Sequence, residues 1–123
     1  MRGVWVGVAG FFGALARYGL DGVVSRWAGG GFPWGTLVVN LSGCFLVGLL
    51  TTLLTERLMP HPTIRIAVTV GFVGAYTTFS TFAYESLRQV QDGAVGLAAV
   101  NVAASVALGV LAAWAGVVAG RAL

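Results

Sequence analysis

Four apolar runs of membrane-spanning length constrain the fold of this 123-residue chain more than any other feature. A helix needs roughly 20 apolar residues to cross the hydrocarbon core of a bilayer. The composition agrees, since 58% of the residues are hydrophobic, 9% are charged and the mean hydropathy is +0.90. We therefore predict an all-α membrane protein, with a single domain over residues 1–123 and four transmembrane helices at residues 3–25, 35–55, 64–84 and 94–119.

The charged residues argue against nucleic-acid binding and say little about orientation. All seven basic residues are arginines scattered singly between the apolar runs, so the net charge of +3 forms no basic patch. With both termini on one side of the membrane, the arginines divide almost evenly between the two faces. The positive-inside rule then fixes orientation poorly and leaves insertion both ways up open.

The third apolar run carries the least ordinary pattern. Gly71 and Gly74 lead into TTFSTF, in which four hydroxyl side chains alternate with two phenylalanines over residues 77–82. Each polar group in hydrocarbon costs free energy unless it is paired, and glycines and successive hydroxyls weaken a continuous helix. We therefore predict a break in the third helix. Carbonyl groups exposed by such a break commonly bind a cation.

The second and fourth runs each place an amide at membrane depth. Asn40 shares a face with Thr36 and Gly43, and Asn101 shares one with Ser105. Spacing favours interhelical hydrogen bonds for these amides, and the alternative is a donor that faces a solvated path. Thr36 is also placed to help cap the first turn of the second helix.

The first run combines a stripe of small residues with a charge. Gly3, Gly7, Gly10 and Ala14 lie on the same face as Arg17, so this face is expected to pack closely against protein. Arg17 either extends to the lipid headgroups or acts as a structural anchor or an attraction for anions, and the pattern favours neither.

The residues of the third run suit a small anion. An aromatic ring has a positive edge, which stabilises an anion that meets it edge-on. Hydroxyl and amide groups add weak hydrogen bonds that are easily exchanged, as permeation requires. Conduction of a metal cation would instead call for rings of carboxylates or carbonyls.

Three ordered motifs resemble those of the small microbial fluoride channels called CrcB or Fluc. Residues 10–18, GFFGALARY, are similar to the family pattern GxxGAxxRY, and residues 35–40, GTLVVN, to GTLxVN. Residues 71–82, GFVGAYTTFSTF, are similar to GxxGxxTTFSTF. The match runs through three of the four helices. It is much more specific than a lone pair of spaced glycines.

The resemblance implies an antiparallel, dual-topology homodimer with two fluoride pathways and a central structural sodium ion. Its motif positions imply a pathway lined by Asn40, Phe79, Ser80, Thr81 and Phe82, with Glu85 toward the far end. Ser105, beside Asn101, is a less specific pathway candidate. The carbonyl oxygens of Gly74 and Thr77 would hold the sodium ion, and Arg17 would support the region of the first two helices.

The implied function is passive fluoride export across the cell inner membrane, with fluoride, sodium, lipid and a second copy as the only partners. A proton-coupled exporter of the small multidrug resistance type is one alternative, although it needs a carboxylate inside the first helix, where this chain has Arg17. A non-transporting assembly subunit is the other. We expect no enzyme, because Cys44 is the only cysteine and His61 stands alone in a loop, without a ligand or base nearby.

Overall fold

The computed structural model describes residues 1–123, and every regular element in it is helical. The order is α1 (Arg2–Ala28), α2 (Trp34–Thr52), the π-helical η1 (Leu53–Arg57), α3 (Pro62–Ile66), the π-helical η2 (Ala67–Val73), α4 (Gly74–Tyr76), α5 (Phe79–Gln91) and α6 (Val95–Ala122). These elements form four spans long and apolar enough to cross a membrane, Arg2–Ala28, Trp34–Arg57, Pro62–Gln91 and Val95–Ala122. The predicted all-α chain with four membrane helices is confirmed.

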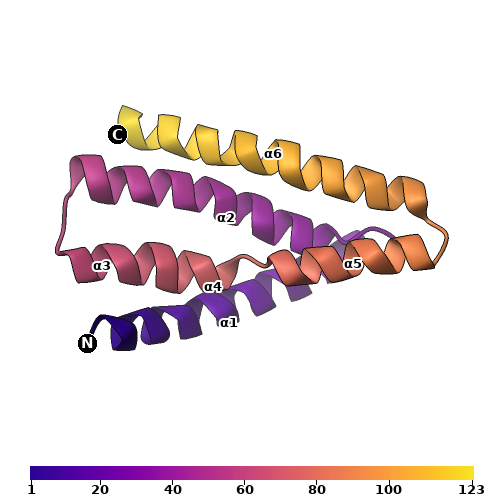
Figure 1. The fold of residues 1–123 in the computed structure, drawn as a ribbon, viewed down its shortest axis with the longest axis horizontal. Helices are drawn as coiled ribbons and strands as arrows, with labels where there is room; N and C mark the ends of the chain where they lie inside the picture. The colour runs from indigo at the N-terminus through magenta and orange to yellow at the C-terminus, as the bar shows by residue number, and fades with distance from the viewer.

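The third span differs most from its predicted bounds. It continues through Gln91 instead of ending near residue 84, so Glu85 and Arg88 belong to helix α5. The connection to α6 is correspondingly short and contains Gly93 at a φ of 81°, a conformation that favours glycine. Both chain termini lie at the same end of the molecule, as four successive spans require (Figure 1).

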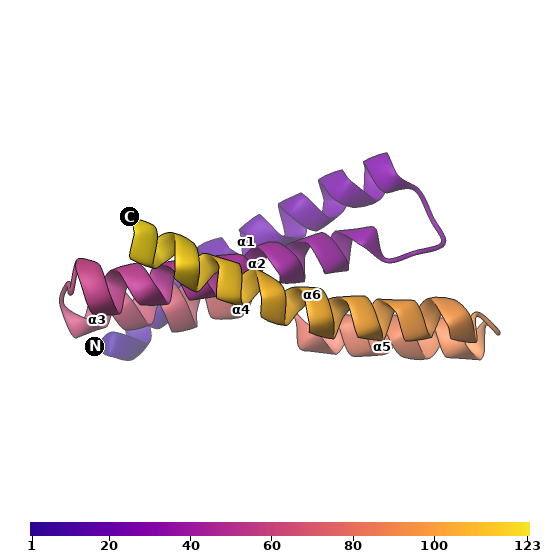
Figure 2. The same ribbon diagram turned by 90° about the horizontal axis from the view of Figure 1, so that it is seen from above.

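The first span packs on different neighbours along its length. α6 lies along α2, and α1 packs on η2 and α4. Viewed from above, α5 runs beside α6, while the C-terminal half of α1 diverges from these two helices and contacts the start of α2, where Asp21 and Ser25 lie against Gly35 (Figure 2). Most of that diverging half is exposed, from Gly22 to the connection at Gly29.

Glycines bring the backbones of α2 and α6 together. A Cβ atom at Gly116 would overlap the carbonyl oxygen of Phe45, and one at Gly48 would overlap the carbonyl oxygen of Ala113. Such close approach is the usual means of helix association in lipid, where apolar side chains gain little by leaving their surroundings. In α1 the close contact within the chain is at Gly13, whose added Cβ would overlap the carbonyl oxygen of Phe72. No neighbouring element lies within 4 Å of a Cβ atom at Gly3 or Gly7, so the predicted protein contact at these two glycines is not made within one chain and stays a prediction.

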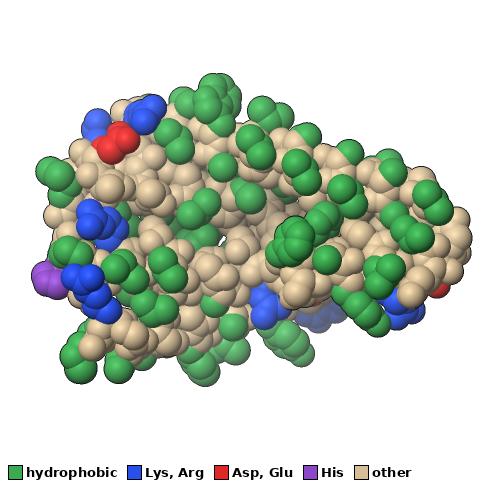
Figure 3. All heavy atoms as spheres, viewed as in Figure 1, with side chains coloured by type: hydrophobic (Ala, Val, Ile, Leu, Met, Phe, Trp, Pro, Cys, Tyr) green, Lys and Arg blue, Asp and Glu red, His purple; other side chains and the backbone are tan.

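The outer surface is apolar, as a lipid-facing surface must be. Only 20 of the 123 residues are buried within the single chain, and Phe11, Val110 and Trp114 are among many large side chains that face outward. Figure 3 shows hydrophobic side chains over the whole visible face, with charged groups near the α2 to α3 connection and the C-terminus and others along the lower edge and at the opposite end. At that end Arg121 forms an ion pair with Glu56 at 3.3 Å.

Candidate functional site: the interrupted third span and its groove

The third span is interrupted at two threonines. Thr77 has φ −84° and ψ 159°, and Thr78 has φ −147° and ψ 110°, so both are extended between the end of α4 and the start of α5. The Thr78 hydroxyl caps α5 by accepting a hydrogen bond from the Thr81 backbone N–H at 3.2 Å. Gly74, three residues earlier, keeps an ordinary helical conformation. The interruption therefore lies after the glycines rather than at them.

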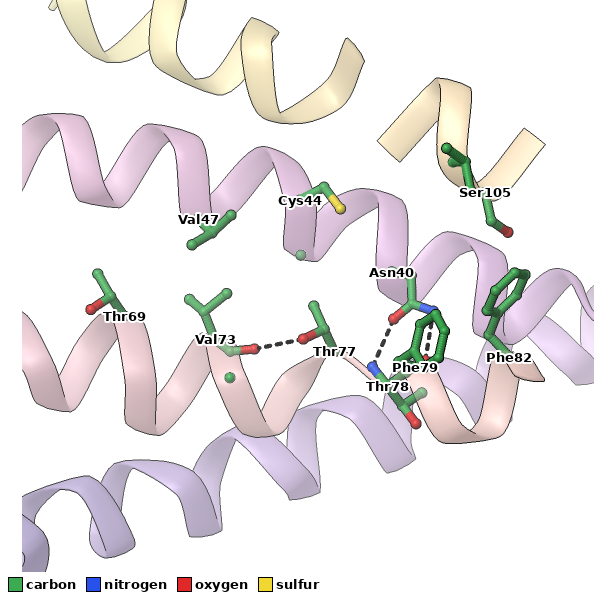
Figure 4. Close-up of a pocket in the computed structure, with 13 residues that line it drawn as sticks. Asn40, Cys44, Val47, Thr69, Val73, Thr77, Thr78, Phe79, Phe82 and Ser105 are labelled. Atoms are coloured by element: carbon green, nitrogen blue, oxygen red, sulfur yellow. Dashed lines mark hydrogen bonds between the residues drawn. The ribbon is translucent and has the colours of Figure 1, made fainter. Parts of the chain in front are cut away.

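Asn40 on α2 holds the extended segment through both atoms of its side-chain amide. Its Oδ1 accepts from the Thr78 backbone N–H at 2.7 Å, and its Nδ2 donates to the Thr78 carbonyl at 2.8 Å (Figure 4). The interhelical hydrogen bond favoured from spacing is therefore present, with backbone as its partner. One N–H of the amide takes no part in either bond, since an amide nitrogen carries two hydrogens.

The interruption leaves carbonyl oxygens without their helical donors. In a continuous helix the Thr78 N–H would bond to the Gly74 carbonyl, but here it bonds to Asn40 instead. The Thr77 carbonyl accepts no hydrogen bond from backbone or side chain. Oxygens freed in this way at membrane depth need a partner other than lipid.

Arg17 contacts the same stretch from α1. Its Nε donates to the Ala75 carbonyl at 3.3 Å in a partly buried position. The expected support of the first two helices by Arg17 stays a prediction, and its hydrogen-bond partner in the chain lies in the third span. A sequence pattern gives no sign of this partner, which is 58 residues away.

An open groove of about 350 Å³ runs along the interruption, between α2, the third span and α6 (Figure 4). The sequence-predicted residues that line it are Asn40, Gly74, Thr77, Phe79, Phe82 and Ser105. Thr69 and Cys44 also line it and were not predicted as site residues. Thr69 stands eight residues before Thr77 on the same side of the span, and that spacing was the available signal.

The two phenylalanines of the groove lie against each other but differ in exposure. Their ring centroids are 5.7 Å apart with an angle of 59° between the planes. Phe82 is only 8% exposed, whereas Phe79 is 79% exposed. Phe82 is therefore part of the packed wall, and Phe79 stands at the open side of the groove.

The other predicted site residues lie outside the groove lining. Ser80 is exposed, and the Thr81 hydroxyl accepts a hydrogen bond from the Thr78 hydroxyl at 2.9 Å. Glu85 lies one turn beyond Phe82 with a buried Oε1 that has no hydrogen-bond partner. Thr36 is buried, but α2 has no side-chain cap and Pro33 occupies the cap position, so the predicted capping role of Thr36 is wrong.

A second series of side-chain hydrogen bonds links α5 to α6. Asn101 donates from Nδ2 to the Ser86 hydroxyl at 3.0 Å, and Ser86 donates to the Phe82 carbonyl at 2.8 Å. Ser105 donates to the Asn101 Oδ1 at 3.5 Å. Because Ser105 lines the groove, this bond connects the series of hydrogen bonds to the groove. Ser86 was not predicted, because a serine four residues after a phenylalanine has no distinctive pattern. These bonds fix the turn of α5 that carries Phe82.

The groove offers an anion one free amide donor and two aromatic rings. The remaining N–H of Asn40 takes part in no hydrogen bond, and the rings of Phe79 and Phe82 lie beside it. The hydroxyls of Thr69, Thr77, Thr78 and Ser105 also line the groove, but each donates its hydrogen within the chain and would reach an anion only by exchanging that partner. No carboxylate lines it. Hydrogen-bond donors and ring edges without a fixed negative charge stabilise an anion and do not favour a cation.

Comparison with known proteins agrees with these features over nearly the whole chain. Residues 4–117 match the family described as CrcB-like protein, Camphor Resistance (CrcB). A fluoride-specific ion channel FluC of Magnetococcus marinus is 50% identical over 121 residues, covering 98% of this chain and 98% of the relative. The FluC of Acidobacterium capsulatum is 46% identical, covering 98% and 97% of the two chains. FluC 2 of Geobacillus kaustophilus is 51% identical, covering 90% and 86%. The chain therefore belongs to the CrcB-like family of multi-pass membrane proteins.

Proposed function

We propose that this chain forms a fluoride-selective channel that lets the ion pass down its gradient across the cell membrane. The observation that carries the proposal is the groove, in which the ring pair and the Asn40 amide meet hydroxyl groups without any carboxylate. The activity is also the one for which the relatives at 46% and 50% identity are named.

A small anion gains from this lining because each partner is weak and several act together. Fluoride holds its water tightly, so a pathway must offer replacement hydrogen bonds at each step. Asn40 supplies one N–H, and Phe79 and Phe82 supply ring edges on the neighbouring turn of α5. Distributed partners let the ion leave as readily as it enters.

A second copy in antiparallel orientation would complete the pathway. In one chain the groove is open, and Phe79 at its margin is 79% exposed, which is a poor arrangement for guiding an ion through lipid. Closed two-fold symmetry would bring two such grooves together and give two pathways in one dimer. The almost even division of the seven arginines between the two ends suits insertion in both orientations.

A sodium ion on the two-fold axis would use the carbonyl oxygens at the interruption. The Gly74 carbonyl has lost its helical donor, and the Thr77 carbonyl accepts no hydrogen bond. Oxygen atoms are the ligands that hard cations take in proteins, so the donor set fits this ion. The ion would supply a positive charge that attracts the carbonyl dipoles of both copies, and would so hold the two interruptions together. The interruption in the chain would leave these oxygens without helical hydrogen bonds and so free to bind the ion.

The remaining predicted residues receive roles from their places along the third span. Ser80 and Thr81 belong to the first turn of α5, where hydroxyls would extend the polar track beyond the interruption. Glu85, with its unpartnered oxygen, would mark the far end of the track. Thr36 and Ser105 would support the two walls, on α2 and α6.

Flux from proteoliposomes tests the proposal. Purified protein in liposomes loaded with fluoride should release the ion down its gradient, at the same rate with or without a proton gradient. Matched liposomes loaded with chloride should release almost none. Equal chloride release would refute selectivity, a strict need for a proton gradient would indicate an exporter, and no release of either ion would leave an assembly subunit.

A further inference from the structure

Two helices hold the interruption of the third span, one on each side of Thr77. Asn40 of α2 bonds to Thr78, which follows Thr77, and Arg17 of α1 bonds to Ala75, which precedes it. No other side chain donates to a carbonyl of residues 74–77. Ser42 of α2 also bonds to α4, but through the Tyr76 hydroxyl, so the Arg17 contact is the one side-chain hydrogen bond to a backbone carbonyl on the α4 side of the interruption.

The Ala75 carbonyl needs this support because its helical donor has moved away. In a continuous helix it would accept from the Phe79 N–H, four residues later. The extended backbone of Thr77 and Thr78 takes Phe79 out of that register. Without Arg17, the carbonyl would lack a donor in a membrane interior, which favours any rearrangement that restores the bond.

Restoring that bond would close the interruption. Closing it requires Thr77 and Thr78 to return to helical backbone angles. The backbone groups of the neighbouring residues would then form the i to i−4 hydrogen bonds of a continuous helix. The Thr78 N–H would again meet the Gly74 carbonyl, and the Thr81 N–H would meet the Thr77 carbonyl. The two oxygens that fit a cation would both be occupied. Arg17 therefore acts on the oxygens of Gly74 and Thr77 through Ala75.

We propose that Arg17 is a positioning residue for the cation site: it occupies the Ala75 carbonyl and thereby leaves the Gly74 and Thr77 oxygens free for the ion. The inference rests on the sodium site of the proposed function. Arginine suits the task, since its guanidinium stays charged and sits favourably at the C-terminal end of the helical run that finishes in α4.

The positive charge of Arg17 and its hydrogen bond to Ala75 act on sodium binding in opposite directions. Whether sodium binding weakens or strengthens when Arg17 is replaced therefore shows which of the two dominates. A positive group near the site repels sodium, so its removal alone would strengthen sodium binding. The hydrogen bond to Ala75 keeps the oxygens available, so its removal would weaken sodium binding. We expect the second effect to dominate, because a hydrogen bond from a charged donor to a buried carbonyl outweighs partly screened repulsion.

The test is the sodium dependence of the thermal stability of the purified protein, with sodium replaced by N-methylglucamine at constant ionic strength. Arg17→Met keeps an unbranched stem as far as the position of Nε and removes the donor and the charge, so its half-saturating sodium concentration should rise roughly tenfold. Arg17→Lys keeps the charge but loses the planar donor, so a smaller rise, about threefold, is expected. The matched control is Arg26→Met, since the Arg26 Nε donates to the Gly22 carbonyl within its own helix.

The outcomes separate this inference from the proposed function. Wild-type protein stabilised by sodium, with an unchanged or lower half-saturating concentration in Arg17→Met, would overturn the role of Arg17 alone. If Arg17→Met does not fold, Arg17→Lys decides, and a wild-type value there overturns the role. A wild type that shows no sodium response removes the sodium site and this inference together, while fluoride flux still tests the channel. An equal shift in Arg26→Met would show a general effect of charge on α1.

Discussion

The side-chain amide of Asn40 forms two hydrogen bonds with the backbone of Thr78, at 2.7 and 2.8 Å, and so replaces the helical partners of a residue in another span. This pairing lets the third span stop being helical inside a membrane without leaving the Thr78 N–H unpaired. It also fixes one edge of the groove that holds Phe79 and Phe82. Structure and proposed conduction thus depend on the same amide.

Replacement of Asn40 is expected to reduce both stability and fluoride flux. Asn40→Ala leaves the Thr78 N–H without an acceptor and the Thr78 carbonyl without a donor, and should cost roughly 1–3 kcal/mol of unfolding free energy. Asn40→Asp keeps an acceptor for that N–H, but it replaces the Nδ2 donor with a carboxylate that repels both the Thr78 carbonyl and an anion. Equilibrium unfolding in detergent and liposome flux measure the two effects.

Ser42→Ala is the matched control for Asn40. Ser42 also lies on α2 and bonds to the third span, through the Tyr76 hydroxyl at 2.7 Å, but it does not line the groove. Its loss should lower stability slightly and leave the flux per folded dimer unchanged. Full flux in Asn40→Ala would show that the amide is only a packing contact.

Replacement of either ring by isoleucine should lower fluoride flux about tenfold, because the aliphatic side chain fills space without a positive edge. Phe82→Ile should also lose roughly 1 kcal/mol of stability, since Phe82 is 8% exposed. Phe79→Ile should leave the stability of the chain unchanged, as Phe79 is 79% exposed. Phe12→Ile on α1, where the ring is 57% exposed away from the groove, should behave as wild type. Unaltered flux in both groove variants would rule out a role for the ring edges.

Much of the fold and several groove residues follow from local sequence pattern. Membrane-length hydropathy predicted the four spans, because length and polarity alone decide whether a segment crosses a bilayer. Polar side chains at membrane depth drew attention to Asn40, Ser105 and the hydroxyls of residues 77–82, and the resemblance to a known family implied their roles; the structure places Asn40, Thr77 and Ser105 in one groove. A polar group in hydrocarbon must have a partner or a solvated neighbour, and that requirement is visible in sequence.

The partners themselves could not be predicted. Asn40 bonds to a residue 38 positions away and Arg17 to one 58 positions away, and periodicity within one helix says nothing about such distances. For the same reason the glycines and the successive hydroxyls of residues 71–82 predicted a break in the third helix, but did not predict that the extended residues are Thr77 and Thr78. The position of the interruption depends on where α2 supplies an amide, a tertiary contact rather than a local preference.

Close packing of α2 and α6 should make Gly116→Ala strongly destabilising. The added methyl group would meet the Phe45 carbonyl and the Leu49 backbone nitrogen, neither of which can rotate away. Overpacking of this kind costs roughly 1–3 kcal/mol. Gly96→Ala on the same helix is the control, because no atom lies within 4 Å of its Cβ position and alanine favours helix. Thermal unfolding that ranks Gly96→Ala at or above wild type and Gly116→Ala well below it supports the packing. Equal values would contradict it.

Dual topology predicts a labelling pattern that single orientation cannot give. His61 lies in the connection at the end of the molecule that also carries both termini, and Asp92 lies in the connection at the opposite end. In a Cys44→Ser background, His61→Cys and Asp92→Cys each provide one exposed thiol. If every dimer holds one copy in each orientation, an impermeant maleimide added to intact cells should label about half of the copies of either variant. Permeabilised cells should then label fully, which controls for thiol reactivity. Nearly complete labelling of one variant and almost none of the other would establish a single orientation. That result would refute the antiparallel dimer, whereas a groove completed by a parallel partner would still be consistent with it.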